Sequence, residues 1–355
     1  MKKPVVKTSA KEGAPALERD RRRLQMADIA RLAGVSVSTV SRALSGSTLV
    51  NAETRTRVAE LAKSLNYTIN QGAQNLRLQK NRTIAVVVPY DAASRQHISD
   101  PFFLAIVGSL ADALTDLGYE MLLTRVDAEK LESAGAAYDA GRVVGVIIIG
   151  QWRHHDQLNG LAARQVPLVV WGAEMPQQIY CTVGGDNRDG GLQATRHLIA
   201  GGRRRILFLG DPALPEVRWR HEGYRDALKE AGIKPDPRWL LSVPFEESAA
   251  RMAVDEAYRS GVSFDGVVAC SDLLALQAVR SVRATGRRVP VDVSITGYDD
   301  APLAAWSAPP LSTIHQPVDQ AGRLIVEALL SQVQGQRPHS RVMPVNLVVR
   351  KSTVP

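Results

Sequence analysis

Short apolar runs recur between residues 83 and 269, and the stretches between them are long enough to hold a helix. The runs are TIAVVVP (83–89), YEMLLT (119–124), VGVIII (144–149), PLVVW (167–171), RILFL (205–209) and DGVVA (265–269). Strands that are apolar along their whole length and alternate with helices are typical of parallel sheets covered on both faces. The length of this region suits two doubly wound parallel-sheet α/β lobes, with a ligand cleft beside the strand ends.

The stretch that precedes these runs has apolar residues at helical spacing instead. The inward face of a first short helix carries Met26, Ile29, Ala30 and Ala33. Gly34 ends that helix and permits a tight turn, after which Ser36 caps a second helix. The second helix turns Val37, Val40 and Leu44 inward, and a third, capped by Asn51, packs through Val58, Leu61, Ala62 and Leu65. The pattern predicts an all-α helix-turn-helix headpiece over residues 24–68.

The outward face of the second helix carries Ser38, Ser41 and Arg42, without any acidic residue. A face of this kind can enter a DNA major groove and offer hydrogen-bond donors to base edges and phosphates. A solvated surface helix is the alternative interpretation of the same pattern.

The charge of the chain is concentrated at its N-terminal end. Residues 1–82 contain 16 Lys and Arg against 6 Asp and Glu, whereas the whole chain has a net charge of +8. A basic module on a near-neutral body indicates a polyanionic partner for the small end, or else a solvated basic tail. Residues 1–23 have the composition of such a disordered tail.

Other classes of protein are disfavoured by what the sequence lacks. It has no apolar run long enough to span a membrane, and its basic N-terminus is not followed by the apolar core of a secretory signal. Cys181 and Cys270 suit a reducing compartment, so we expect a cytoplasmic location. Phosphate-binding loops, dinucleotide-binding glycine motifs and nucleophile elbows do not occur, and the turn at 154–156 predicts no metal site. We therefore expect no enzymatic activity and no cofactor.

Residues 26–70 resemble the headpiece of the lactose-repressor (LacI) family of transcriptional regulators. The shared pieces are Asp28-Ile29-Ala30, Ala33-Gly34-Val35-Ser36, Thr39-Val40-Ser41-Arg42, Thr54-Arg55 and Leu65-Asn66-Tyr67. The resemblance implies that Val37, Ser38 and Arg42 read bases, with core packing as the alternative for Val37. It implies that phosphates are held by Ser36, Thr39, Ser41, Asn51 and Thr54.

Residues 69–81 form a hinge segment and linker by the same resemblance. In the family this segment folds as a helix on the operator, and a leucine from each subunit wedges into the minor groove. The spacing places Ala73 and Leu76 in these roles, although Ile69 stands where the family usually has proline. The alternative is an ordinary flexible linker.

Residues 82–355 resemble the family's effector-binding and dimerisation domain, which is similar to periplasmic sugar-binding proteins. The matching residues include Pro101-Phe102-Phe103, Gly185-Asp186-Asn187, Arg220, Gly223-Tyr224, Ser271-Asp272, Gly297-Tyr298-Asp299 and Thr313-Ile314-His315-Gln316-Pro317. The effector site implied by the resemblance consists of Phe102, Phe103, Trp171, Asp186, Arg220, Phe245, Ser271 and Asp299. An ion pair between lobes is the alternative for Arg220 with Asp299, and core packing is the alternative for Phe103, Phe245 and Trp171.

The resemblance implies a homodimeric regulator, typically a repressor, whose affinity for a pseudo-palindromic operator is controlled by a small molecule. Leu214 and Glu216 replace the residues with which the family's purine-binding branch holds its ligand, so a sugar, sugar acid or polyol is the preferred effector. Three other hypotheses remain: a regulator that senses nothing, a transport-type binding protein and an enzyme. Whether the effector induces or corepresses is open.

Overall fold

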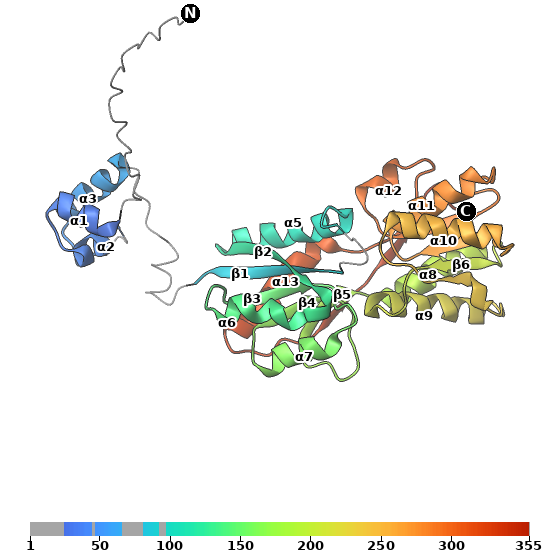
Figure 1. Cartoon of the computed structure of the whole chain (residues 1–355), viewed down its shortest axis with the longest axis horizontal. Coiled ribbons are helices and arrows are strands. Elements are labelled where there is room, and N and C mark those ends of the chain that lie inside the picture. The colour runs from blue at the N-terminus through green and yellow to red at the C-terminus, as the bar shows by residue number, and fades with distance from the viewer. Residues whose placement is uncertain (1–24, 45–46, 66–80, 92–96, 355) are drawn as a thin grey trace, which may run out of the picture. The chain divides into compact units, whose positions relative to one another are not determined.

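The computed structural model of the chain describes residues 25–44, 47–65, 81–91 and 97–354. It divides into two compact units, Met1–Lys80 and Asn81–Pro355 (Figure 1). The predicted tail and residues 69–80 of the predicted hinge, including Ala73 and Leu76, lie outside the described residues.

The first unit contains three short helices, α1 (Met26–Ala33), α2 (Val37–Leu44) and α3 (Ala52–Ser64). Gly34 has φ 64°, the left-handed conformation that lets α1 stop and the chain turn into α2. At the start of α3 the side chain of Asn51 accepts a hydrogen bond from the backbone N–H of Thr54 at 2.7 Å, as expected of a cap. The sequence thus provides the stop after α1 and the cap at the start of α3.

The core of this unit takes one fully buried side chain from each helix, Ile29, Val40 and Val58. The expectation that Val37 faces inward is wrong, because Val37 is 40% exposed. Val37 stands in the first turn of α2, and the inward stripe of that helix runs through Val40 and Ala43. The packing alternative for Val37 is thereby removed.

The second unit begins with a lobe built on a six-stranded parallel sheet of order β11-β5-β4-β3-β1-β2. Its strands are β1 (Thr83–Tyr90), β2 (Glu120–Asp127), β3 (Gly145–Ile149), β4 (Leu168–Trp171), β5 (Cys181–Gly185) and β11 (Arg341–Met343). Alternate side chains of β1 enter two cores: Ile84, Val86 and Val88 pack beneath α5 (Pro101–Asp116) and α13 (Val318–Val333). Ala85 and Val87 pack on the other face, with η1 (Ala128–Gly135), α6 (Ala136–Asp139) and α7 (His155–Ala163).

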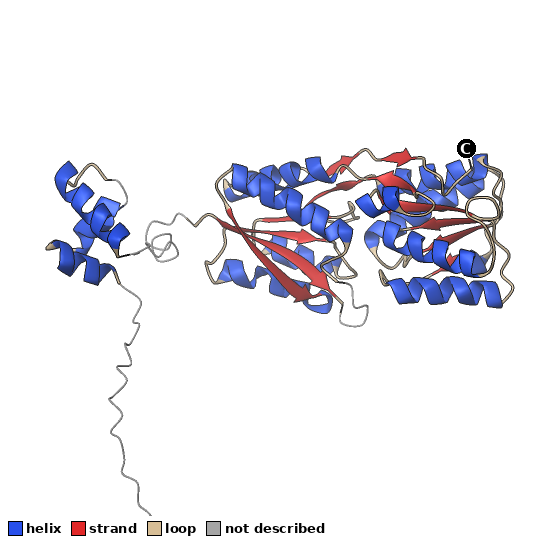
Figure 2. Ribbon diagram, turned by 90° about the horizontal axis from the view of Figure 1, so that it is seen from above, coloured by secondary structure: helices blue, strands red, loops and turns tan. Residues whose placement is uncertain are grey.

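The second lobe has a sheet of order β12-β10-β9-β8-β6-β7, in which only β10 and β12 pair antiparallel. Its strands are β6 (Ile206–Leu209), β7 (Leu240–Leu241), β8 (Gly266–Ala269), β9 (Ser294–Asp299), β10 (Ser312–His315) and β12 (Asn346–Val348). Its helices are α8 (Asn187–Ala200), α9 (Pro215–Glu230), α10 (Glu247–Arg259), α11 (Asp272–Ala284) and α12 (Pro302–Trp306), with a short η2 (Pro237–Trp239). Helices lie on both sides of the strands (Figure 2).

The chain passes between the two lobes at three places within the described residues: from β5 to α8, from β10 to α13, and from β11 to β12. The first lobe is thus completed by α13 and β11, which follow most of the second lobe in the chain. The second lobe is completed by β12, which follows β11. Three short connections restrain the lobes to a limited set of relative movements.

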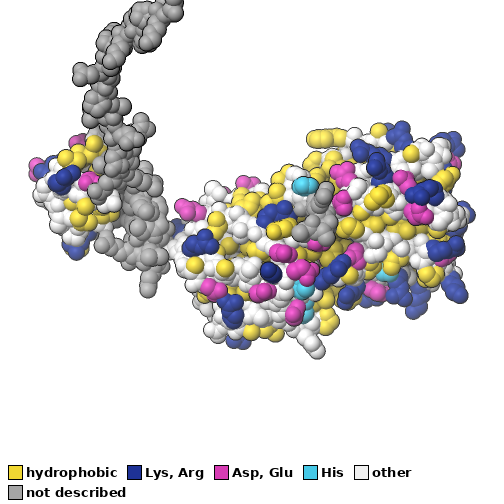
Figure 3. All heavy atoms as spheres, viewed as in Figure 1, with side chains coloured by type: hydrophobic (Ala, Val, Ile, Leu, Met, Phe, Trp, Pro, Cys, Tyr) yellow, Lys and Arg dark blue, Asp and Glu magenta, His cyan; other side chains and the backbone are white. Residues whose placement is uncertain are grey.

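The predicted fold class is confirmed, and each of the six apolar runs contains a strand. The strands that the runs did not reveal include β5, β9 and β10, whose glycine and polar residues break the apolar pattern even though most of their side chains are buried. On the face of the second unit that Figure 3 shows, Lys and Arg stand among Asp and Glu, in keeping with its near-neutral charge.

Helices α8 and α9 touch through their backbones. A Cβ on Gly191 would lie 2.0 Å from the carbonyl oxygen of Arg220, and one on Gly223 would lie 1.9 Å from that of Arg188. These distances are far below van der Waals contact, so the two helices can approach this closely only because both positions are glycine.

We therefore expect Gly223→Ala to lower the free energy of unfolding by about 3 kcal/mol, the upper end of typical overpacking costs. Gly160→Ala, in the exposed interior of α7 with no atom near its new methyl group, should instead raise it by about 0.5–1 kcal/mol. Thermal unfolding midpoints of the two variants test the difference. A Gly223→Ala protein as stable as the original would show that α8 and α9 do not touch in this way.

Candidate functional site

The outward surface of the headpiece is built on the start of α2. The hydroxyl of Ser36 accepts a hydrogen bond from the backbone N–H of Thr39 at 3.1 Å and so caps the helix. The same hydroxyl lies 2.8 Å from the hydroxyls of Ser38 and Thr39. Val37, Ser38 and Arg42 are exposed beside it, and α2 has no acidic residue. This surface offers hydroxyl and guanidinium donors without a carboxylate that would repel phosphates.

The other predicted DNA-contacting residues that the structure describes lie on α2 and at the start of α3, and all but Ser41 are near a helix start. Thr39 and Ser41 are half-buried on α2, Asn51 is exposed, and Thr54 is half-buried in the first turn of α3. Helix starts carry unpaired backbone N–H groups and a partial positive charge, which suit phosphate oxygens.

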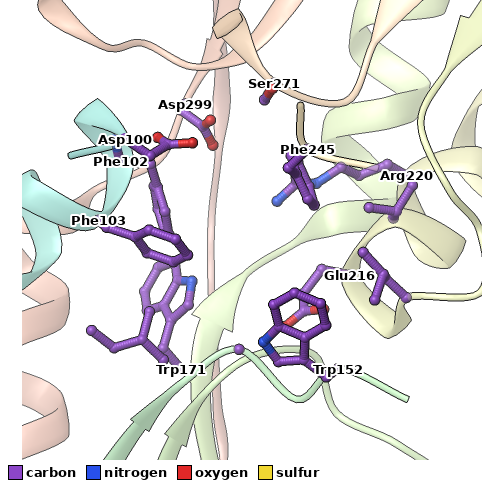
Figure 4. Close-up of a pocket in the computed structure, with 14 residues that line it drawn as sticks. Asp100, Phe102, Phe103, Trp152, Trp171, Glu216, Arg220, Phe245, Ser271 and Asp299 are labelled. Carbon is purple, nitrogen blue, oxygen red and sulfur yellow. Dashed lines mark hydrogen bonds between the residues drawn. The ribbon is translucent and has the colours of Figure 1, made fainter. Parts of the chain in front are cut away.

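A cleft between the two lobes of the second unit forms the other candidate site (Figure 4). It encloses about 640 Å³ of space, including its open mouth. Its walls consist of Asp100, Phe102, Phe103, Ile149, Gly150, Trp152, Trp171, Leu214, Glu216, Val217, Arg220, Phe245, Ser271 and Asp299. These residues follow the carboxyl ends of strands in both sheets, where ligands bind in doubly wound folds.

One wall of the cleft is aromatic. Asp100 caps α5 by accepting a hydrogen bond from the N–H of Phe102 at 2.9 Å, which holds Phe102 and Phe103 in the first turn. The ring of Phe102 lies 5.9 Å from the rings of both Phe103 and Trp171, between centroids. Figure 4 places Trp152 and Phe245 on the opposite side. Aromatic faces on two sides suit a flat ligand with apolar faces.

Arg220 is buried in the opposite wall and held at three points. Its Nε donates to Asn187 at 2.8 Å, and an Nη donates to the carbonyl of Cys270 at 2.5 Å. The guanidinium carbon also lies 3.7 Å from the centre of the Tyr298 ring, a cation–π arrangement. Arg220 thus bonds to Asn187 and Cys270 rather than to Asp299, unlike the predicted alternative of an ion pair between lobes.

Asp299 ends β9 with a φ of 110°, a conformation that non-glycine residues rarely adopt. It accepts a hydrogen bond from the side chain of Gln316 at 2.8 Å. Burial raises the pKa of Asp299 well above its usual range, against the opposing effect of Arg220. Burial likewise raises the pKa of Glu216, whose carboxylate accepts a 3.4 Å hydrogen bond from the N–H of Gln151 in the other lobe. Both carboxyl groups can accept hydrogen bonds from ligand hydroxyls.

Asp272 holds the turn that follows Asp299. One of its carboxylate oxygens accepts from the N–H of Ala301 at 2.8 Å, and the other accepts from the hydroxyl of Thr313 at 2.5 Å. Gly297 makes room for it, since a Cβ there would lie 2.2 Å from the carboxylate. Burial raises the pKa of Asp272 to about 7, despite the two hydrogen bonds, which lower it.

Seven of the eight predicted effector residues line this cleft: Phe102, Phe103, Trp171, Arg220, Phe245, Ser271 and Asp299. Asp186 does not line it and instead caps α8, accepting from the N–H of Asp189 at 2.9 Å. Residues 214–219 form the cap and first turn of α9 rather than a loop; Leu214, Glu216 and Val217 line the cleft, whereas Arg218 and Trp219 do not. Asp100 and Trp152 are missing from the predicted site, although Asp100 directly precedes the motif Pro101-Phe102-Phe103 and could have been found from it.

The residues that the structure describes contain no cluster of metal ligands. His154 lies 3.0 Å from Glu129, and His155 lies 2.8 Å from the hydroxyl of Tyr180, so the neighbouring imidazoles have separate partners. No helix in the described part of the chain has the length and apolar character needed to cross a membrane.

Comparisons with known proteins agree with both parts of the chain. Residues 25–70 match the model of bacterial regulatory proteins of the lacI family, and residues 195–353 match that of the periplasmic binding protein-like domain. The HTH-type transcriptional regulator CelR of Thermobifida fusca is 34% identical over 342 residues, which cover 94% of this chain and 99% of that protein.

Solved structures give the same result. The lac repressor dimer bound to operator and the anti-inducer ONPF superposes with a TM-score of 0.83 at 26% identity, over 94% of this chain and 100% of that one. A complex of the regulator CelR with cellobiose superposes with a TM-score of 0.69 at 33% identity, over 93% of this chain and 100% of that one.

The raised pKa of Asp272 predicts how stability depends on pH. Because the folded-state pKa lies above the ordinary value of 3.8, the contribution of this group is fully present below about pH 4 and is lost as the pH rises through 7. An Asp272→Asn variant carries an amide there, which cannot titrate. We expect the unfolding midpoint of the original protein, relative to that of the variant, to fall between pH 5 and pH 8. A constant difference across this range would contradict the assignment.

Proposed function

The chain belongs to the lacI family of bacterial regulatory proteins, and we propose that an uncharged sugar bound in its cleft controls how tightly its headpiece binds operator DNA. The family and the fold make it a sequence-specific DNA-binding transcriptional regulator. The observation that carries the proposal for the sugar is the cleft itself, in which carboxylates and one fixed arginine stand among aromatic rings at the strand ends of both lobes.

The aromatic rings and the carboxylates each favour a carbohydrate. Sugar rings have apolar C–H faces that stack on aromatic side chains, and their hydroxyls donate to carboxylates and accept from a guanidinium. CelR, a relative of this chain, has been solved with cellobiose, which supports a sugar-type ligand.

The balance of charge favours an uncharged sugar over a sugar acid. Three carboxyl groups, those of Asp100, Glu216 and Asp299, line the cleft against the single arginine, which already bonds to Asn187 and Cys270. Burial has raised the pKa of two of them, and an anionic ligand would raise both further. An anion would therefore shift both groups toward their protonated forms, whereas a neutral sugar would not.

The headpiece supplies the DNA-binding part of the proposal. We assign base reading to Val37, Ser38 and Arg42, of which Arg42 can pair bidentately with guanine. Phosphate contacts are assigned to Ser36, Thr39, Ser41, Asn51 and Thr54, and minor-groove insertion to Ala73 and Leu76 in the hinge. A homodimer places two headpieces on a pseudo-palindromic operator. A protein with this role works where the chromosome is, in the bacterial cytoplasm.

The sugar acts by favouring one arrangement of the lobes. Phe102 and Trp171 come from the first lobe, and Arg220 and Asp299 from the second, so a ligand that touches all four binds best at one angle between the lobes. An ion pair between Arg153 and Asp211 also joins the lobes beside the cleft. Typical coupling free energies between two such sites are about 1–3 kcal/mol.

Arg42→Ala should weaken operator binding by about 10-fold or more and relax the preference for one sequence, since one good bidentate contact discriminates by about 1–3 kcal/mol. Arg57→Ala removes the same charge from the exposed face of α3 and serves as the matched control. Fluorescence anisotropy with specific and random duplexes measures both. Equal losses in the two variants would mean that Arg42 contributes charge alone.

Asp299→Asn removes the carboxylate while placing a residue that tolerates positive φ. We expect the variant to lose stabilisation by sugar in a thermal-shift assay and to bind operator with unchanged affinity. Asp299→Ala should behave alike if it folds, which circular dichroism checks. A sugar response retained by folded Asp299→Asn would remove Asp299 from the site.

A further inference from the structure

A groove lined by arginines lies in the second lobe, away from the cleft. Its walls consist of Arg283, Gly286, Arg287, Arg288, Val289, Ala308 and Pro309, none of which lines the cleft. The space that it leaves for a ligand is about 410 Å³, within the range of about 300–1,000 Å³ that is typical of small-molecule sites. We call it the arginine groove.

The arginine groove lies at the edge of the second sheet opposite the cleft. Helix α11 begins after β8, beside the cleft, and ends at Ala284, so residues 286–289 stand before the start of β9. Residues 308 and 309 likewise stand before β10, which pairs parallel to β9. The cleft is lined instead by Ser271 and Asp299, at the carboxyl ends of β8 and β9. A ligand in the groove can therefore bind at the same time as a ligand in the cleft.

Arg287 is a half-buried cation in the wall of this groove. Its Nη2 donates to the carbonyl oxygen of Phe264 at 2.6 Å, and the guanidinium carbon lies 4.8 Å from the centre of the Phe264 ring. Asp265 and Asp292 stand nearby but form their ion pairs with other arginines, so Arg287 has no carboxylate partner among the described residues. Burial lowers the pKa of Arg287. This charge has therefore lost part of its hydration without gaining a counter-charge, which an anion in the groove would supply.

Arg283 faces the same groove from the last turn of α11. One of its Nη atoms donates to the carbonyl oxygen of Ala308 at 2.9 Å, and in the described part of the chain it forms no ion pair. Gly286, with a φ of 82°, lets the chain turn after α11 so that Arg287 lines the groove as well. A guanidinium has five N–H donors, so both arginines keep several for a ligand.

The other cations at this edge of the sheet are engaged within the protein. Arg288 pairs with Asp292, and Arg205 pairs with Asp265. An Nη of Arg203 donates to the carbonyl oxygens of residues 290 and 291. The donors that remain are thus concentrated in the groove instead of forming a long basic row, which favours a small anion over an extended polyanion.

The rest of the lining indicates what such an anion is attached to. Val289, Ala308 and Pro309 contribute apolar surface, and no Asp or Glu belongs to the described wall. Guanidinium groups match phosphate oxygens in bidentate geometry, which makes arginine the preferred residue for phosphate recognition. Two arginines beside an apolar wall therefore suit a phosphate group joined to an uncharged organic part.

We propose that the arginine groove binds a small organic phosphate. Its phosphate group lies against Arg283 and Arg287, and its uncharged part lies against Val289 and Pro309. The proposal goes beyond the sugar function and does not depend on it, because the groove and the cleft have no wall residue in common.

Calorimetric titration of the full chain at constant ionic strength tests the inference, with phenyl phosphate and inorganic phosphate as the ligands. We expect phenyl phosphate to bind about 5-fold more tightly or better, because its ring buries apolar surface that inorganic phosphate lacks. Equal affinities for the two, or binding of neither, would overturn the proposal.

Arg283→Gln locates the site. We expect this variant to bind phenyl phosphate about 10-fold more weakly, the effect of losing one charged hydrogen bond. Arg280→Gln is the matched control, since it removes the same charge from the exposed surface of the same helix, outside the groove, and should change the affinity less than about 2-fold. Circular dichroism checks that both variants fold.

Equal losses in the two variants, or no loss in folded Arg283→Gln, would contradict the assignment. Anisotropy with a random DNA duplex addresses the other kind of occupant. A duplex affinity that falls about 10-fold in Arg283→Gln and is unchanged in Arg280→Gln would assign the groove to a polyanion and overturn the proposal.

Discussion

The fixed position of the Arg220 guanidinium is the constraint on which the cleft depends. A buried cation is costly unless its hydrogen bonds are made, and here Asn187 and the Cys270 carbonyl accept two of them while the Tyr298 ring covers one face. The close contact of α8 with α9 brings Asn187 next to Arg220, and it requires glycine at 191 and 223. The packing of these two helices, together with Cys270 and Tyr298 from the ends of β8 and β9, determines where the positive charge of the cleft lies. The carboxylates around it acquire their perturbed pKa values from the same burial.

Communication between the cleft and the DNA follows from the way the lobes are joined. Three connections cross between them, and each lobe contains a segment that returns from the other. Asp272 stabilises the unusual turn after Asp299 from within the second lobe, while Asp100 fixes the aromatic turn of the first. A ligand that contacts both turns therefore favours one angle between the two lobes. In our proposal this angle sets the separation of the two headpieces of a dimer.

Much of this arrangement could be predicted from the sequence, and the exceptions have physical reasons. The apolar runs revealed the buried strands, because a strand covered on both faces must be apolar throughout. Strand β5 escaped notice since its glycines allow close packing where a larger apolar residue would otherwise stand. Val37 fits the inward periodicity because it stands three residues before Val40, but in the first turn of α2 it lies outside the core that Val40 and Ala43 enter.

In the candidate site too, some residues could be predicted from the sequence and others could not. The resemblance identified Arg220, Asp299 and the aromatic residues at positions 102 and 103, because they belong to recognisable motifs. Asp272 was noted as part of such a motif, but its role depends on contacts with Ala301 and Thr313 that lie 29 and 41 residues away. Trp152 is placed by an unusual backbone conformation that no local pattern announces.

The central claim is that a sugar in the cleft changes the affinity of the headpiece for DNA. The most direct measurement is the dissociation constant of the full chain for a pseudo-palindromic operator at fixed salt, with and without a saturating concentration of the tightest-binding sugar. Our account predicts a change of about 5- to 150-fold, the range that corresponds to 1–3 kcal/mol of coupling. An operator affinity that is identical in both conditions, while the sugar is shown to be bound, would contradict it.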